Sequence, residues 1–386
     1  MARCRPRSFA RLPAPRTSCR SNSFVCSSRP IMKTPARSQI PKGVPTFLPV
    51  AAREKRALED VVFAVFKERG YQEVIPPTFE YLDVLSPGLN AELIEKSYKV
   101  VDRATGRILV LRPDATAQIA RMVAMGMLEG ELPLRLYYSV NVFRYEPEHA
   151  GRDREFFQIG IELIGARGPA ADVEPIIVAA ECLRRLGIPS FTIAIGQGAF
   201  FNALLRRTGV SESLLVALRE AAARKDIGQM ERLLSGAGVR GSVAKALLSL
   251  PELFGGREVL EEAARLALRA DDCHRPLGQL KEVWDRITAA GLGEHLLVDM
   301  GEVRRMEYYT GLVFDIYADG LGSEVGGGGR YDGLIGRFGR EIPSTGFAFD
   351  VDRLLQLRDM QAHDATNAKS SPSCVSSRKL RAKGRS

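Results

Sequence analysis

One stretch of the chain, residues 134–165, constrains the fold more than any other and reads LRLYYSVNVFRYEPEHAGRDREFFQIGIELIG. Residues 134–146 and 155–165 each alternate apolar and polar side chains and are rich in Tyr, Phe, Val and Ile, which is typical of half-buried strands. The polar residues between the two runs, among them His149 and Arg152, predict a turn. We therefore expect an antiparallel hairpin with a long basic tip.

The predicted hairpin places polar groups on one face of a sheet. Because side chains alternate along a strand, Gln158 and Glu162 would share a face of the second strand. Arg144, near the end of the first strand, could reach the same concave surface. An arginine, an amide and a carboxylate that converge in this way indicate a site for a small polar ligand. A ladder of surface ion pairs would use the same residue types, so the hairpin alone leaves both interpretations open.

The charge of the chain is unevenly distributed. The formal net charge is +9, yet residues 1–53 contain eleven Lys and Arg and no Asp or Glu, and residues 365–386 contain six and none. The body between these flanks is therefore acidic, with a net charge of about −8. Electrostatic capture of nucleic acid needs clustered basic side chains. The acidic body argues against an RNA- or DNA-binding core.

The two basic flanks, residues 1–40 and 361–386, are expected to be disordered. Residues 1–40 lack the apolar segment of a secretory signal, and their composition fits either a transit peptide or a start codon assigned too early. We favour the second, with Met32 as an alternative start, which implies a cytoplasmic protein. No apolar run is long enough to cross a bilayer. The six cysteines lack the spacing of a metal site or a disulfide framework, so no metal or cofactor is expected.

The body, residues 41–360, is expected to be one mixed domain. Apolar residues recur at helical spacing in residues 54–69, where Gly70 should end the helix. From residue 199 to residue 292 the chain is almost entirely of helical character, which predicts a helical insertion at about residues 200–290. Short extended runs predict strands at residues 107–112, 190–195, 296–300, 308–318 and 344–349.

Two segments of the body could hold a ligand or could serve structure alone. Asp114 lies between a predicted strand and a predicted helix, where an Asp commonly caps the helix and where its carboxylate could also hold a ligand ammonium. Residues 326–331 read GGGGRY, and glycines permit close approach of another backbone. No helix-opening GxGxxG or Lys-Ser/Thr follows, so this run is neither a dinucleotide fingerprint nor a P-loop.

Five segments resemble, in the same order, the catalytic-domain motifs of histidyl-tRNA synthetase. They are RPDATAQIAR (112–121), FRYEPEHAGRDREFFQIGIELIG (143–165), VRRMEYYTGLVF (303–314), GGGRYDGL (327–334) and STGFAFDVDRLL (344–355). The resemblance implies the class II aminoacyl-tRNA synthetase-like fold of the α+β class. That fold is an antiparallel sheet flanked by helices, here with a helical insertion, and it forms a homodimer.

Two types of protein carry these motifs, the synthetase and the regulatory subunit of ATP phosphoribosyltransferase. The second lacks aminoacylation and assembles with a short-form catalytic subunit at the first step of histidine biosynthesis. Three features favour it. After Leu357 the sequence holds a basic, low-complexity tail where a synthetase continues into an anticodon-binding domain. Asp350 stands where the synthetase has a glycine, three residues before Arg353. The run 303–309, VRRMEYY, lacks the usual Gly-Leu-Asp, although Arg304 still matches.

The amino-acid pocket of the family is implied to survive. The residues that would bind L-histidine are Asp114, Thr116, Arg144, Gln158, Glu162, Arg304, Tyr308, Tyr309 and Tyr331. The first two would hold the α-amino group, and the next two the carboxylate side. Glu162 and Tyr309 would receive the imidazole, because a carboxylate accepts a ring N–H and a hydroxyl can bond the other nitrogen. Glu162, on a sheet face with no obvious fixed partner, is expected to set the selectivity.

The Asp350 carboxylate would lie beside the polyphosphate of ATP. At about 4 Å the unscreened repulsion is roughly 1–4 kcal/mol for an effective dielectric of 80 to 20, which would impair nucleotide binding and spare the amino-acid pocket. Asp350 could instead cap the final helix, which would still remove the glycine. The sequence thus favours a non-catalytic subunit that binds histidine for feedback control and activates the catalytic subunit. A truncated or divergent histidyl-tRNA synthetase is the alternative, and a synthetase-like RNA-binding module is a third.

Overall fold

The computed structural model describes residues 41–128, 130–145, 154–267, 271–302 and 309–370, with side chains described as far as Gln361. All described helices and strands lie in one compact unit, Lys42–Ser386. Residues 1–40 and 371–386, expected to be disordered, and the predicted tip of the hairpin, residues 146–153, lie outside the described residues.

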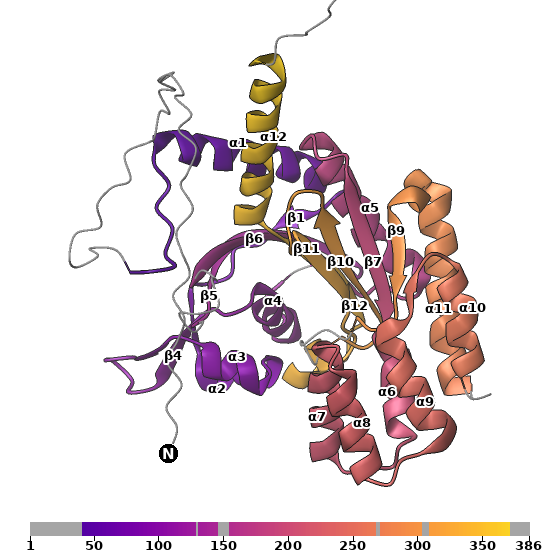
Figure 1. Ribbon diagram of the computed structural model, residues 1–386. Coiled ribbons are helices and arrows are strands. Elements are labelled where there is room, and N and C mark those ends of the chain that lie inside the picture. The colour runs from indigo at the N-terminus through magenta and orange to yellow at the C-terminus, as the bar shows by residue number, and fades with distance from the viewer. Residues whose placement is uncertain (1–40, 129, 146–153, 268–270, 303–308, 371–386) are drawn as a thin grey trace, which may run out of the picture. The chain divides into compact units, whose positions relative to one another are not determined.

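A nine-stranded sheet organises this unit (Figure 1). Its strands are β1 (Gln72–Glu73), β5 (Leu134–Phe143), β6 (Glu155–Ile164), β7 (Phe191–Gln197), β8 (Phe254–Gly255), β9 (Leu296–Asp299), β10 (Leu312–Ala318), β11 (Gly326–Arg330) and β12 (Ser344–Asp350). Their order in space is β1-β5-β6-β12-β11-β10-β7-β9-β8, with parallel pairing only at β1–β5 and β7–β9 among the described strands. A mostly antiparallel sheet with helices on it confirms the expected α+β class.

A smaller sheet has the order β2-β4-β3, from strands β2 (Phe79–Tyr81), β3 (Lys99–Val101) and β4 (Ile108–Leu111). All of its pairs are antiparallel. Two short helices follow β2 and precede β3 in the chain, α2 (Leu82–Leu85) and α3 (Ala91–Lys96). The strand predicted at residues 107–112 is therefore present as β4.

The hairpin predicted from residues 134–165 is formed by β5 and β6. Leu136 pairs with Glu162, and Val140 pairs with Gln158. Facing residues of antiparallel strands project to the same side, and both Gln158 and Glu162 line one cavity. The expectation that these two side chains share a face is confirmed.

Helices cover both faces of the large sheet. Helices α1 (Pro49–Glu68), α5 (Pro169–Arg185) and α12 (Val351–Ser370) pack together over one face, and α4 (Ala115–Ala124) packs against β5 (Figure 1). Helix α12 continues past residue 360, where a disordered tail was expected. The sequence QAHDATNAKS that follows Met360 contains neither Gly nor Pro, so it holds no signal that would end a helix.

The alternation along β5 separates two hydrophobic cores. Tyr137 belongs to the core formed with α1 and α5, and its neighbour Tyr138 belongs to the core formed with α4. Successive side chains of a strand point to opposite faces. The residues of β5 therefore contribute alternately to the two cores. The face that carries Tyr138 is also the face that carries Glu162.

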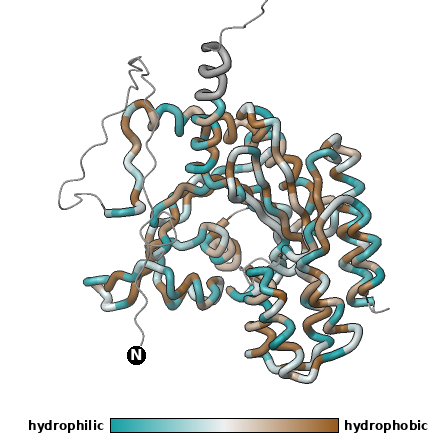
Figure 2. Tube along the Cα trace, in the orientation of Figure 1, coloured by the Kyte–Doolittle hydropathy of each residue, from teal (hydrophilic) through white to brown (hydrophobic). Residues whose placement is uncertain are grey.

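Between Gly198 and Leu292 the regular structure is helical apart from β8. The helices are α6 (Gly198–Arg206), α7 (Glu212–Ala223), α8 (Ile227–Gly236), α9 (Gly241–Ser249), α10 (Glu258–Leu266) and α11 (Asp271–Ile287). Figure 2 shows hydrophilic and hydrophobic residues alternating along α10 and α11, as in helices that bury one side. In the described part of the chain, no helix combines the length and the apolar character needed to cross a bilayer.

The glycine run 326–329 is a central strand rather than a loop. Strand β11 lies between β10 and β12, and a Cβ atom added to Gly326 would lie 2.6 Å from the carbonyl oxygen of Ala348. A Cβ atom added to Gly328 would collide with the carbonyl oxygen of Gly346. Strand β12 therefore approaches β11 so closely that side chains are excluded from the contact, and this close approach brings the β11 and β12 backbones together beside the cavity.

Replacing Gly328 with alanine should destabilise the fold by about 3 kcal/mol or more, because the new methyl group meets backbone atoms that cannot move aside. The matched control is Gly278→Ala in α11, where nothing lies within 4 Å of the added atom. That change should stabilise the protein by about 0.5–1 kcal/mol, since glycine weakens a helix interior. Urea unfolding measures both variants. Equal stabilities of the two would contradict the close approach of β11 to β12.

Candidate functional site

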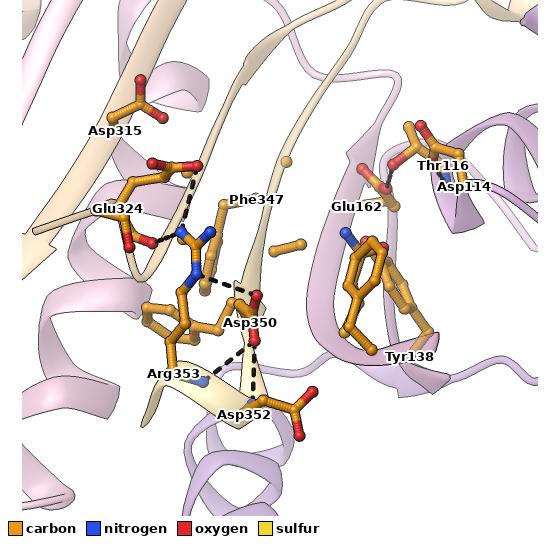
Figure 3. A pocket seen from close by; sticks show the side chains of 18 of the residues that line it. Asp114, Thr116, Tyr138, Glu162, Asp315, Glu324, Phe347, Asp350, Asp352 and Arg353 are labelled. Atoms are coloured by element: carbon orange, nitrogen blue, oxygen red, sulfur yellow. Dashed lines mark hydrogen bonds and ion pairs between the residues drawn. The ribbon is translucent and has the colours of Figure 1, made fainter. Parts of the chain in front are cut away.

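A cavity of about 650 Å³ opens on the face of the large sheet that carries α4. Nine of the residues predicted from the sequence to form a site line this cavity: Asp114, Thr116, Arg144, Gln158, Glu162, Tyr309, Tyr331, Asp350 and Arg353. The other two predicted residues, Arg304 and Tyr308, lie outside the described residues. Figure 3 shows two groups of side chains on the two sides of β12, one around Glu162 and one around Arg353.

Glu162 is the buried centre of the first group. Its side chain is 2% exposed. The Thr116 hydroxyl donates to Oε1 at 2.7 Å, and the Tyr331 hydroxyl donates to the other oxygen. The expectation that Glu162 lacks a fixed partner is therefore wrong, because the start of α4 and the residue after β11 each bring a hydroxyl to it. Opposite Glu162 on β12 stands Gly346, where any side chain would collide with the carboxylate.

Burial changes the ionisation of Glu162. It raises the pKa of this carboxyl to about 8, and the hydroxyl bonds from Tyr331 and Thr116 only partly offset the effect, while nearby Asp114 adds to it. At neutral pH the group is mostly a neutral acid, able to donate one hydrogen bond as well as accept. A ligand that brings a ring N–H or a positive charge would stabilise the ionised form. The Glu162 carboxyl can therefore hydrogen-bond a ligand that contains a nitrogen ring.

Tyr138 is a site residue that the sequence reasoning missed. It is 1% exposed and lines the cavity, and burial raises the pKa of its hydroxyl well above the ordinary value. It pairs with Gly160 across the hairpin, and a Cβ atom on Gly160 would lie 2.9 Å from the tyrosine oxygen. The signal was present in the sequence, since the period of two places Tyr138 on the face that carries Glu162.

Asp114 caps helix α4. Its side chain accepts a hydrogen bond from the backbone N–H of Thr116 at 2.7 Å, and the residue is 4% exposed. The capping interpretation is confirmed. Asp114 also lines the cavity, so the cap and a contact with a ligand ammonium are compatible, and the second remains a prediction. The same turn presents the Thr116 hydroxyl to Glu162, because capping fixes the first residues of the helix.

Arg144, which directly follows β5, and Gln158, near the start of β6, also line the cavity. The Arg144 Nε donates to the carbonyl oxygen of Pro113 at 2.8 Å, and its guanidinium lies 5.0 Å from the ring centre of Phe156. Its Nη2 is buried and has no acceptor among the described residues. A buried donor left unpaired costs about 1–3 kcal/mol. A carboxylate of a ligand would satisfy it, and the role of Arg144 in holding such a carboxylate stays a prediction.

The second group surrounds Arg353. The Asp350 carboxylate caps α12, accepting from the backbone N–H groups of Asp352 at 3.0 Å and Arg353 at 3.2 Å. It also pairs with the Arg353 Nε at 3.3 Å, while Glu324 pairs with the Arg353 Nη1 at 3.3 Å (Figure 3). Asp315 and Asp352 line the same end of the cavity. The capping alternative for Asp350 is confirmed, and the arginine at this end already lies between two carboxylates.

The described residues contain no group of three or more His, Cys, Asp or Glu side chains arranged to hold a metal ion. The acidic side chains at the Arg353 end nevertheless give that end a negative surplus. A polyphosphate would have to displace carboxylates from the guanidinium without a built-in metal site to offset its charge. At the Glu162 end, the buried carboxyl is bonded by two neutral hydroxyls, and the Asp114 carboxylate and the Arg144 guanidinium both line the cavity.

The sheet, the hairpin and the capped helices around this cavity define a protein of the class II aminoacyl-tRNA synthetase-like fold. A family model described as Histidyl-tRNA synthetase matches residues 43–354. The ATP phosphoribosyltransferase regulatory subunit of Moorella thermoacetica is 44% identical over 320 residues, which cover 83% of this chain and 82% of the relative. That of Syntrophotalea carbinolica is 40% identical over 332 residues, covering 86% and 77%.

Two solved structures of similar proteins match the fold of this chain. The crystal structure of an ATP phosphoribosyltransferase regulatory subunit/histidyl-tRNA synthetase from Bacillus halodurans C matches with a TM-score of 0.75 and 31% identity, covering 87% of this chain and 90% of that one. A histidine–tRNA ligase subunit from Alicyclobacillus acidocaldarius matches with a TM-score of 0.71 and 26% identity, covering 85% and 99%. The chain belongs to the ATP phosphoribosyltransferase regulatory subunits, within the histidyl-tRNA synthetase family.

The raised pKa of Glu162 makes stability depend on pH in one direction. The folded protein binds this proton more tightly than the unfolded chain does, so the contribution of Glu162 to the free energy of unfolding falls as pH rises from about 4.5 to about 8. Glu162→Gln cannot ionise. The free energy of unfolding of the wild type minus that of the variant should therefore fall over this window, by at most about 1.4 kcal/mol per pH unit.

Urea titrations of both proteins at several pH values measure this difference. Asp172, whose pKa burial raises to about 6, titrates in both proteins and cancels. A difference that stays flat between pH 5 and pH 8 would contradict a buried, protonated Glu162.

Proposed function

We propose that this chain is a non-catalytic regulatory subunit that binds L-histidine in the cavity and thereby controls a short-form ATP phosphoribosyltransferase catalytic subunit. The proposal rests chiefly on the contrast between the two ends of the cavity. One end keeps a buried acid with two fixed hydroxyls around Glu162, while at the other Arg353 lies between Asp350 and Glu324. The first suits an imidazole, and the second opposes a nucleotide.

The binding mode follows from the groups that line the Glu162 end. The imidazole would lie against Glu162 and Tyr309, where the carboxyl can accept a ring N–H or donate to the bare ring nitrogen. The ligand carboxylate would lie within reach of Arg144, whose buried Nη2 has no acceptor among the described residues. Its ammonium would face Asp114, which already lines the cavity beside Thr116. Each charged group of histidine thus meets a group of complementary charge.

Feedback control would be a coupling free energy between this pocket and the active site of the partner. Such couplings are typically 1–3 kcal/mol, and they require that histidine bind one state of the complex more tightly than the other. Activation would likewise require that the subunit prefer the competent state of its partner. The pocket therefore need not contact the reacting atoms of the catalytic subunit.

We further propose a homodimeric core. Exposed apolar side chains on and beside the three-stranded sheet support a protein partner there: Phe79 at 48%, Val100 at 48%, Val101 at 59% and Ile108 at 39% exposure. Clusters of this kind on a soluble protein commonly mark an interaction surface. The acidic body does not support the RNA-binding alternative, since it offers no surplus of basic side chains to phosphate.

The purified chain should sediment as a dimer, co-purify with a short-form catalytic subunit and make phosphoribosyl transfer sensitive to L-histidine. Glu162→Gln should raise the histidine concentration for half inhibition at least tenfold, because the variant cannot carry the charge that balances an imidazolium. The control is Glu155→Gln on the same strand, whose carboxylate bonds Asn141 outside the cavity. A subunit that neither associates with the catalytic chain nor alters its activity would refute the proposal.

The wild-type chain should catalyse no histidine-dependent exchange of pyrophosphate with ATP, since its nucleotide end is acidic. Asp350→Gly removes one of the two carboxylates paired with Arg353 and should raise the affinity for ATP at least tenfold, which corresponds to about 1.4 kcal/mol. Equilibrium dialysis with labelled ATP measures this gain, and Asp319→Gly, away from the cavity lining, is the control. Pyrophosphate exchange by the wild type would favour the synthetase alternative.

A further inference from the structure

Arg330, the last residue of β11, is a buried arginine that the pocket itself does not use. It is 8% exposed. Its Nε donates to Asp172 Oδ1 at 2.6 Å, and its Nη1 donates to Asp332 at 2.9 Å and to the carbonyl oxygen of Ala166 at 3.2 Å. Asp172 is 6% exposed in the first turn of α5. The ion pair therefore joins the end of a central strand to a helix.

The pair lies on the face of the sheet opposite the cavity. Arg330 reaches α5, whereas the next residue, Tyr331, belongs to the core formed with α4 and donates to Glu162. Neighbouring residues of an extended chain project to opposite sides. The position of the Arg330 backbone thus sets how far the Tyr331 hydroxyl extends toward Glu162.

Arg330 also contacts the segment that directly follows Tyr309, the second tyrosine of the pocket. The carbonyl oxygen of Arg330 accepts from the backbone N–H of Thr310 at 2.8 Å, and the Thr310 hydroxyl accepts from the N–H of Asp332 at 2.9 Å. A Cβ atom on Gly311 would lie 3.2 Å from the Arg330 Cδ, so the chain after Thr310 packs on the arginine stem. Tyr309 precedes this anchor, with its ring 6.5 Å from that of Tyr331 at 75°.

A buried ion pair is weak evidence for stability. Removing charges from water can cost more than their attraction returns, and apolar residues of similar size often replace such a pair without loss. Burial in fact raises the pKa of Asp172 to about 6 although Arg330 is adjacent. The Arg330 Nη2 is also buried without an acceptor among the described residues. A geometric role explains better why such a costly pair stands behind the pocket.

We propose that the Arg330–Asp172 ion pair is a positioning device that sets, from behind the sheet, the backbone from which Tyr331 and Tyr309 reach the ligand. It deepens the proposed function, on which its ligand readout rests. Neither residue touches the ligand. Their effect is to hold two ring hydroxyls at the spacing that an imidazole beside Glu162 requires.

The test uses the full chain with Arg330→Met/Asp172→Leu, which removes both charges at once and leaves no buried charge unpaired. Its urea midpoint should equal or exceed that of the wild type, while its dissociation constant for L-histidine, measured by calorimetry, should rise at least tenfold. Arg330→Lys keeps the charge and part of the donor set, and it should recover part of the affinity. The control, Lys55→Met/Glu59→Leu, removes a buried pair within α1 and should leave the affinity within twofold.

A second readout needs no ligand. Hydrogen exchange of the Thr310 amide, which donates to the Arg330 carbonyl, should be faster in the Arg330→Met/Asp172→Leu variant and unchanged in the control. A folded variant with unchanged affinity and unchanged exchange overturns the positioning role. If the wild type itself fails to bind histidine, the proposed function fails, and the exchange of Thr310 alone then decides: faster exchange supports the positioning role, and equal exchange overturns it.

Discussion

A carboxyl group buried in a sheet face, Glu162, imposes most of the architecture around the cavity. A buried acid must be hydrogen-bonded, and here hydroxyls arrive from two remote elements, Thr116 at the start of α4 and Tyr331 after β11. It must also have room, which Gly346 provides on the facing strand β12, where any side chain would collide with the carboxyl group. Because β12 lies beside β6 in the sheet, Gly346 lies directly opposite Glu162.

The two ends of the cavity differ in the charge of their side chains. Around Glu162 the side chains are neutral or balanced, and Arg144 retains a buried donor without an acceptor among the described residues. At the Arg353 end, the Asp350 and Glu324 carboxylates already form ion pairs with the guanidinium. Membership among ATP phosphoribosyltransferase regulatory subunits, inside a synthetase family, fits this division. Under the proposed function, the amino-acid end of a synthetase-like cavity would be retained and its nucleotide end would be lost.

Much of this could be read from the sequence. The period of two in residues 134–165 predicts the hairpin and the shared face of its polar residues. The position of Asp114 ahead of a predicted helix predicts that it caps that helix. The partners of Glu162 could not be predicted, because they lie far away in sequence and meet only through sheet order. The sequence did not predict a strand at the β11 glycines, because glycine is depleted in strands. The close approach of another backbone that these glycines permit is present between β11 and β12. Glu324 carries no local signal at all.

The most direct measurement is a crystal structure of the chain grown with L-histidine and a non-hydrolysable ATP analogue, both at saturating concentration. The expected result is density for an imidazole against Glu162 and Tyr309, with the Arg353 guanidinium still between Asp350 and Glu324 and no nucleotide beside it. Both ligands bound, with the amino-acid carboxylate aligned on the α-phosphate, would contradict the account of a pocket that has kept its amino acid and rejected its nucleotide.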